Sequence, residues 1–76
     1  MHIIIPKTTK ETLEKNGWKY KPALQLYHKE FHECSVCIQK PDIEFPYICW
    51  IPPLARTTPD DLIAIANELK KLEMKE

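Results

Sequence analysis

Two histidines and two cysteines within one ten-residue segment are the densest group of chemically reactive side chains in the sequence. They are His28, His32, Cys34 and Cys37, in the spacing H-x-x-x-H-x-C-x-x-C. Imidazole and thiolate are ligands that zinc prefers, and a structural zinc site needs four such groups in a tetrahedron. A thiol beside an imidazole can also be activated as a nucleophile. The segment therefore suggests two hypotheses, a zinc site and a cysteine-dependent enzyme.

The same segment alternates as a β-hairpin does, which limits both hypotheses. A two-residue turn at residues 32–33 predicts three cross-strand pairs on one face, Phe31 with Cys34, Lys29 with Val36 and Tyr27 with Ile38. The opposite face then carries His28 and Cys37 as neighbours, so at most His28, His32 and Cys37 could share a metal ion. A small zinc-stabilised module using these three residues is one alternative. Because the turn lacks Asn-Gly or Asp-Gly, a register shifted by one residue is also allowed, and it would exchange the faces.

The residues around this pair do not form a complete catalytic site. No third group is evident that would orient Cys37 and His28, and Gly17 is the only glycine, so a glycine-rich oxyanion loop cannot form. We therefore expect a protein that is not an enzyme and that needs no cofactor. We expect the odd set of three cysteines, which Cys49 completes, to be reduced and packed as small apolar groups.

The first part of the chain predicts a short strand and a short helix. The β-branched run Ile3–Ile5 is typical of an edge strand, which could pair with its twin and give a homodimer. Thr8 or Thr9 can cap a helix that continues to about Asn16, and Thr8-x-x-Glu11 has the spacing of a capping box. This helix has few apolar residues, so it should lie shallowly on the fold.

The second half of the chain predicts an apolar strand and an amphipathic helix. Residues 45–51 form the most apolar stretch, and we expect this strand to be covered on both faces. The run Thr57-Thr58-Pro59-Asp60-Asp61 combines an N-cap, a proline at the first helical position and acids in the first turn. It predicts a helix over residues 59–73. We expect its apolar stripe to cover the sheet, and the stripe comprises Leu62, Ile65, Ala66, Leu69 and Leu72.

Together these elements predict one α+β domain over residues 1–76. Its three- to four-stranded antiparallel sheet is covered by the C-terminal helix, and a short N-terminal helix precedes it. A chain of 76 residues has room for one small core, and 43% hydrophobic residues are enough to form one. No segment has the length of a membrane span, and residues 1–6 are too short for the apolar part of a signal peptide. We therefore expect a cytoplasmic protein with no membrane partner.

The charge balance disfavours nucleic acid as a partner. Eleven basic and eleven acidic side chains give a formal net charge of zero. A protein that neutralises phosphates usually carries an excess of lysine and arginine, which produces a field that attracts polyanions. We therefore expect that nucleic acid is not the usual ligand.

The run Leu13-Glu14-Lys15-Asn16-Gly17-Trp18, followed by strands, the strand end Ile51-Pro52 and a C-terminal helix, resembles HicA-type toxins. The resemblance implies an α-β-β-β-α fold of the double-stranded-RNA-binding type and the activity of an mRNA interferase. In that family a histidine on the first strand, placed after glycine and serine, carries RNA cleavage. His28 is the position that corresponds, although Leu26-Tyr27 precede it here. The resemblance gives an alternative function, RNA cleavage or RNA binding through His28.

The chain is also similar in size and charge to small accessory proteins of phages and mobile elements, among them anti-CRISPR and other anti-defence inhibitors. That resemblance implies binding to a host protein, in the host cytoplasm if the chain is phage-encoded. We therefore expect a small protein-binding module that inhibits by occlusion, for example of a CRISPR–Cas component. Interfaces of this kind have aromatic anchors inside a polar rim. The candidate contact residues are Trp18, Lys19, Tyr20, Lys21, Tyr27, Lys29, Glu30, Trp50 and Arg56.

Overall fold

The computed structural model describes residues 2–73 and has a sheet of five strands, where the sequence predicts three or four. The strands are β1 (His2–Ile5), β2 (Lys19–Lys21), β3 (Leu26–Glu30), β4 (Ser35–Gln39) and β5 (Tyr47–Trp50). The helical segments are α1 (Lys10–Lys15), the 3₁₀ turn η1 (Leu54–Arg56) and α2 (Pro59–Glu73). Neighbouring strands are antiparallel, in the order β1-β5-β4-β3-β2. The predicted α+β class, antiparallel sheet and C-terminal helix are confirmed.

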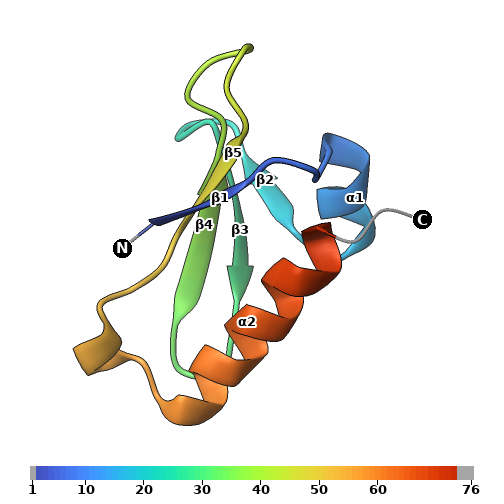
Figure 1. The fold of residues 1–76 in the computed structure, drawn as a ribbon. Helices are drawn as coiled ribbons and strands as arrows, with labels where there is room; N and C mark the ends of the chain where they lie inside the picture. Colours follow the sequence, from blue (N-terminus) through green and yellow to red (C-terminus); the bar gives the residue numbers. More distant parts are fainter. Residues whose placement is uncertain (1, 74–76) are drawn as a thin grey trace.

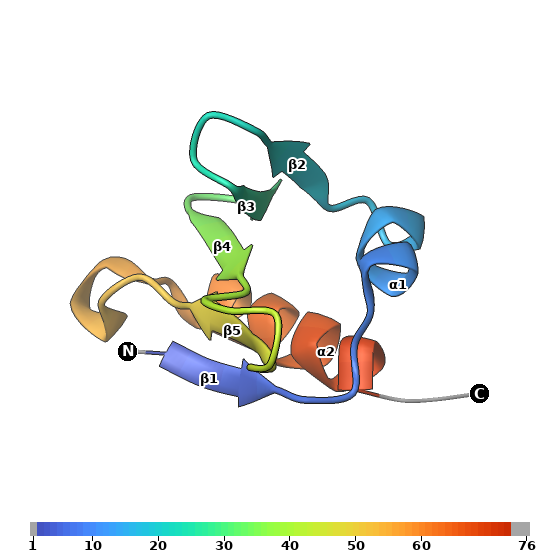
Figure 2. The same ribbon diagram turned by 90° about the horizontal axis from the view of Figure 1, so that it is seen from above.

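Only one face of the sheet is covered. Helix α2 runs obliquely across it (Figure 1), and Figure 2 shows a curved sheet with both α-helices on the same side. The strand residues buried on that covered face are Ile5, Tyr27, Val36, Ile38 and Cys49. The prediction that residues 45–51 are covered on both faces is wrong, because Trp50 points to the other face and is 47% exposed. We call this second face the open face.

The predicted β-hairpin register is confirmed. Strands β3 and β4 pair with His28 opposite Cys37, in the frame that the two-residue turn at residues 32–33 requires. The N–H of Phe31 donates to the carbonyl oxygen of Cys34 at 2.7 Å and closes that turn. Alternation of apolar and polar residues was therefore sufficient to fix which side chains share a face.

The turn of this hairpin is stabilised from helix α2 rather than by glycine. The Asp61 carboxylate accepts hydrogen bonds from the N–H groups of His32 (3.1 Å) and Glu33 (2.8 Å). Asp61 is only 2% exposed, and its own N–H donates to the N-cap hydroxyl of Thr58 at 3.2 Å. The Asp61 carboxylate thus accepts from two backbone N–H groups of the turn. Without it, these N–H groups would lie against the first turn of α2 with no acceptor from this side chain.

Strand β2 is the element that the sequence did not predict. Its three residues, Lys-Tyr-Lys, are all exposed, and three residues are too few for their alternation to identify a strand. It forms as the second edge of the sheet by pairing with β3, where Lys19 lies opposite His28 and Tyr20 opposite Tyr27. Gln25, in the connecting turn, has φ 53, a conformation in which glycine or asparagine is usual. Hydrogen bonding to a neighbouring strand, which periodicity does not report, explains the extra strand.

The edge strand predicted at Ile3–Ile5 is present as β1 and pairs with β5. Strand β5 begins at Tyr47 rather than at Phe45, because Pro46 has no N–H to offer to the ladder. Phe45 is consequently left in a loop, where it is 58% exposed.

Segment α1 has six residues and is capped by Thr9, whose hydroxyl accepts from the N–H of Thr12 at 3.2 Å. The capping box predicted from Thr8 and Glu11 does not form, because Thr8 precedes the cap and its hydroxyl is buried without a partner. Leu13 is fully buried, so this short segment contributes to the core.

Helix α2 has the predicted bounds but buries a different stripe. Leu62 is 41% exposed and Ala66 is exposed as well, whereas Asp61 and Glu68 are buried. Two acids are therefore buried at positions that the pattern assigned to solvent. Three of the five predicted residues do face the sheet, namely Ile65, Leu69 and Leu72.

Candidate functional site

The open face carries two of the four reactive side chains that the sequence identifies, His28 and Cys37. The strand register places them in a row of five residues, in the order Lys19, His28, Cys37, Trp50 and His2. The ring centroids of His2 and Trp50 are 5.1 Å apart. His28 and Cys37 are half-buried cross-strand neighbours, as predicted. The row is an aromatic and basic strip across the sheet.

The zinc ligands suggested by the sequence do not converge. Within residues 2–73 the structure has no group of three His, Cys, Asp or Glu side chains that could hold a metal ion. His32 lies in the hairpin turn, and Cys34 packs against the core on the covered face. The alternative zinc set of His28, His32 and Cys37 therefore has no support from the geometry.

Two of the three thiols are poorly suited to nucleophilic chemistry. Burial raises the pKa of Cys49 to about 12. Burial also raises the pKa of Cys34, and the negative charge of Asp61 raises it further. Since the thiolate is the reactive form, both thiols are unreactive at neutral pH.

A buried polar cluster links α2 to the rest of the fold and includes two of the predicted contact residues. The indole N–H of Trp18 donates to a Glu68 carboxylate oxygen at 2.9 Å. The Lys29 ammonium lies 3.2 Å from the other oxygen and donates to the carbonyl of Asn16 at 2.8 Å. Trp18 is 3% exposed. Trp18 belongs to the core, so its prediction as a partner contact is wrong, whereas Lys29 has a side chain that is 26% exposed and is engaged in this cluster.

Tyr27 is also buried, at 6% exposed, and is corrected in the same way because it packs on the covered face. The remaining predicted contacts are exposed but lie on four different elements, β2, β3, β5 and η1. They are Lys19, Tyr20, Lys21, Glu30, Trp50 and Arg56. The strand register places Lys19, Lys21, Glu30 and Trp50 on the open face, whereas Tyr20 points to the covered face and Arg56 lies on η1.

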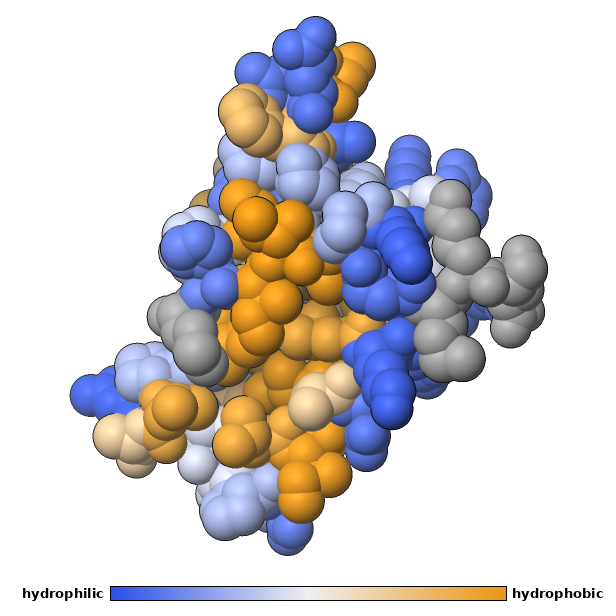
Figure 3. Space-filling view, in the orientation of Figure 1, coloured by the Kyte–Doolittle hydropathy of each residue, from blue (hydrophilic) through white to orange (hydrophobic). Residues whose placement is uncertain are grey.

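An apolar surface that the sequence analysis did not identify lies where β1 and α2 meet. Figure 3 shows hydrophobic side chains gathered over β1 and the neighbouring part of α2. The strand side includes Ile3, which is 39% exposed and points to the same face as the buried Ile5, and the helix side includes Leu62, which is 41% exposed. We call this surface the β1–α2 patch and define it as Ile3, Leu62, Ile63 and Ala66. Leu62 and Ala66 belong to the predicted stripe, so the signal was present, but the rotation of the helix was not predictable.

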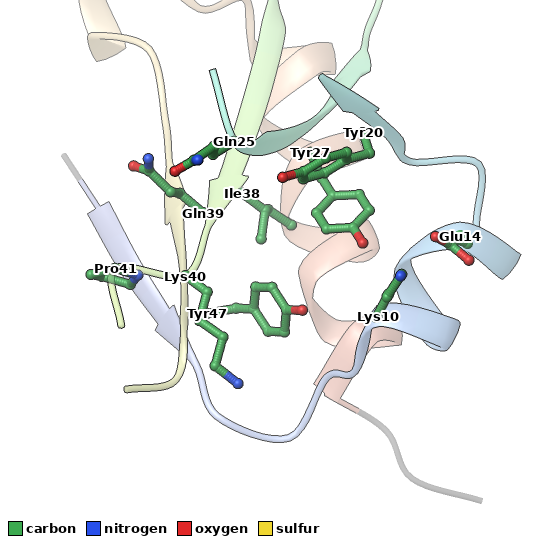
Figure 4. A pocket seen from close by; sticks show the side chains of 10 residues that line it. All are labelled: Lys10, Glu14, Tyr20, Gln25, Tyr27, Ile38, Gln39, Lys40, Pro41 and Tyr47. Atoms are coloured by element: carbon green, nitrogen blue, oxygen red, sulfur yellow. The ribbon is translucent and has the colours of Figure 1, made fainter. Parts of the chain in front are cut away.

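A second feature is a cavity of about 540 Å³ between α1 and the covered face, shown in Figure 4. Three tyrosine rings dominate its wall, and we call it the tyrosine pocket. The centroids of Tyr20 and Tyr27 are 5.1 Å apart, and those of Tyr27 and Tyr47 are 6.3 Å apart. It is lined by Lys10, Glu14, Tyr20, Gln25, Tyr27, Ile38, Gln39, Lys40, Pro41 and Tyr47.

Comparisons with known proteins assign no relative to this chain. No family model, no curated protein and no solved structure matches it. In the part of the chain that the structure describes, no helix is both long and apolar enough to cross a membrane. We therefore infer a function from the surfaces of the protein itself.

Proposed function

We propose that the chain is a non-enzymatic protein-binding module that contacts its partner through the β1–α2 patch. The observation that carries this proposal is the grouping of exposed apolar side chains beside β1, which is an edge strand of the sheet within residues 2–73. Covering such side chains is favourable, and contiguous apolar patches mark interaction sites more often than scattered residues do.

The edge strand indicates what kind of partner would bind. Folded proteins usually protect an edge with charges, prolines or a covering segment, but Ile3–Ile5 carries no charge. An extended segment of a partner could add to β1 as a sixth strand, with its backbone hydrogen-bonded to the edge. Apolar side chains of that segment would then lie against Leu62 and Ala66. We therefore propose that the partner is a protein that supplies a β-strand to this edge.

Occlusion is the mode of action that fits this surface. A module without an assembled active site acts by covering what its partner needs, which is how we expect an inhibitor of a host defence protein to work. The neutral net charge means that no long-range field steers the encounter. Affinity would then depend on the apolar contact and on strand pairing, with little dependence on salt.

The test compares two substitutions that each replace an exposed apolar residue by glutamate. Leu62→Glu changes the β1–α2 patch, and Ile43→Glu changes the β4–β5 loop, where Ile43 is 87% exposed. Tagged proteins capture partners from lysate with and without RNase, and the partner is then purified and titrated. We expect Leu62→Glu to weaken binding at least about tenfold and Ile43→Glu to leave it unchanged.

Three results would contradict the proposal. A partner that binds Leu62→Glu as tightly as wild type does not use the patch. Self-association that Leu62→Glu abolishes would instead make the occupant a second copy, as in the homodimer through Ile3–Ile5. Capture that depends on RNA would favour the second candidate.

The second candidate is RNA binding or cleavage on the open face. It is favoured by the row in which His28 lies between Lys19 and the exposed Trp50, since basic and aromatic side chains together bind single strands. Replacing His28 by alanine tests it. Loss of RNA cleavage or of toxicity would support the ribonuclease, and unchanged behaviour would remove it.

A further inference from the structure

The tyrosine pocket has the size of a small-ligand site. Its volume of about 540 Å³ lies within the range of roughly 300–1,000 Å³ that is usual for such sites. It lies on the covered side of the sheet, whereas the β1–α2 patch lies along the β1 edge (Figure 3, Figure 4). The function of the pocket is therefore a separate question from the function proposed above.

The orientation of the rings disfavours a flat ligand. The planes of Tyr20 and Tyr27 are inclined by 57°, and those of Tyr27 and Tyr47 by 73°. A planar ring can lie parallel to only one of these three surfaces. A compact cation has no such restriction, because it is attracted to the face of any ring whose centroid lies within about 6 Å.

One ring already holds an ammonium group. The Lys40 nitrogen lies 5.1 Å from the centroid of the Tyr47 ring. Lys40 follows β4 and is exposed, so its side chain can move into solvent when another cation takes its place. The geometry of this internal contact shows that the Tyr47 face accepts a cation.

Acidic side chains of α1 lie near the hydroxyl ends of Tyr27 and Tyr47. Burial raises the pKa of Tyr27, and its neighbours Tyr47 and Glu14 raise it further. Burial likewise raises the pKa of Tyr47, with added contributions from Glu11 and Glu14. Carboxylates that disfavour a phenolate at this end favour a positive charge there. In Figure 4 the hydroxyls of Tyr27 and Tyr47 point toward α1, which carries both glutamates.

Two lysines at the pocket are the reason to consider an anion instead. Lys10 lies on the α1 side and Lys40 on the β4 side. An anion between them would face the Glu14 carboxylate and the electron-rich ring faces, both of which repel it. A cation site and an anion site predict opposite changes in ligand affinity when Lys40 loses its charge.

We propose that the tyrosine pocket binds an organic cation whose ammonium head lies against the face of Tyr47, close to Glu14. The cation displaces Lys40 from the Tyr47 ring. The ammonium comes either from a free small amine or from a lysine-type side chain of a peptide.

Choline and its neutral isostere 3,3-dimethylbutan-1-ol test the proposal, because the two have the same shape and differ in charge. Each is titrated into the full chain at constant ionic strength, and the ring proton resonances of the tyrosines are followed by NMR. We expect saturable shifts with choline and binding at least about fivefold weaker for the alcohol. Equal binding of the two compounds would overturn the proposal.

Three variants assign the binding to named groups. Tyr47→Leu should weaken choline binding about fivefold, whereas Tyr47→Phe, which keeps the ring face, should bind like wild type. Lys40→Gln should strengthen binding about threefold, because it removes a competing ammonium. If Lys40→Gln weakens binding instead, or if benzoate saturates the pocket and choline does not, the site binds anions and the proposal is wrong.

A last titration identifies the source of the ammonium. A short peptide with one trimethyllysine is compared with choline and with the same peptide carrying the neutral tert-butyl analogue. Tighter binding of the charged peptide than of choline assigns the pocket to a side chain, and the reverse order assigns it to a free amine. Failure of every cation to bind overturns this inference and leaves the β1–α2 patch untouched.

Discussion

Polar side chains have different roles on the covered face and on the open face of the sheet. On the covered face, Asp61 and Glu68 are buried and fully engaged with donors from the hairpin turn, Trp18 and Lys29. On the open face, Trp50 and its neighbours are presented to solvent. Two of the residues that look reactive in the sequence, His28 and Cys37, thus lie on the open face, whereas two acids that look solvated are buried in the core. Residue type alone did not distinguish these roles.

The largest expected effect tests the role of Asp61 on the covered face. Asp61→Ala removes the acceptor of two hairpin N–H groups and a charge at the start of α2, so we expect a loss of about 3 kcal/mol in the free energy of unfolding. Urea denaturation measures it. Asp60→Ala is the control, because Asp60 is exposed in the same helical turn and should change stability by less than about 0.5 kcal/mol. Equal effects of the two variants would mean that Asp61 acts only through the helix dipole.

The two tryptophans compare the faces directly. Trp18→Phe removes the hydrogen bond to Glu68 from a buried ring, and we expect it to cost about 2 kcal/mol. Trp50→Phe on the open face removes no such bond and should cost less than about 0.5 kcal/mol. Both are measured by circular dichroism in urea. A loss of stability at Trp50 that matches the loss at Trp18 would show that the open face is part of the core.

The parts of the fold that follow local rules could be predicted from the sequence. The hairpin register came from alternation, and the bounds of α2 came from the run Thr57-Thr58-Pro59-Asp60-Asp61. The buried acids could not be predicted, because their donors lie 28 or more residues away in the chain and belong to a turn and to an indole. Binary patterning assigns such positions to solvent, since it counts only how apolar each residue is.

The candidate sites were predictable to a smaller extent for the same reason. Most anchors were chosen for aromatic type, and burial removed Trp18 and Tyr27 from that set. The tyrosine pocket depends on α1 and β2 meeting the covered face, which involves contacts between distant segments. The β1–α2 patch depends on the rotation of α2, and the two buried acids set that rotation.

The response to alkaline pH should reflect the covered face. The Cys49 pKa of about 12 lies above its value in the unfolded chain, so the unfolded state loses this proton first. Stability should therefore fall as pH rises from about 9 toward 12, with a loss on the order of 1–2 kcal/mol by pH 10. Urea midpoints at pH 7 and pH 10 under reducing conditions measure it. The Cys49→Ala variant should lose less stability between pH 7 and pH 10 than the wild type. An equal loss in the variant would assign the effect to Tyr27 and Tyr47, whose pKa values are also raised.

The smallest expected effect is at His28 on the open face, one residue after the buried Tyr27. His28→Ala should change the free energy of unfolding by less than about 0.5 kcal/mol, because the imidazole is half-buried on the face that no helix covers. Urea denaturation at pH 7 measures it. If stability is unchanged, any loss of RNA cleavage in this variant can be assigned to the imidazole and not to unfolding. If His28→Ala lowers the free energy of unfolding by more than about 1 kcal/mol, the side chains of the open face stabilise the fold. The two faces would then not differ in the way described above.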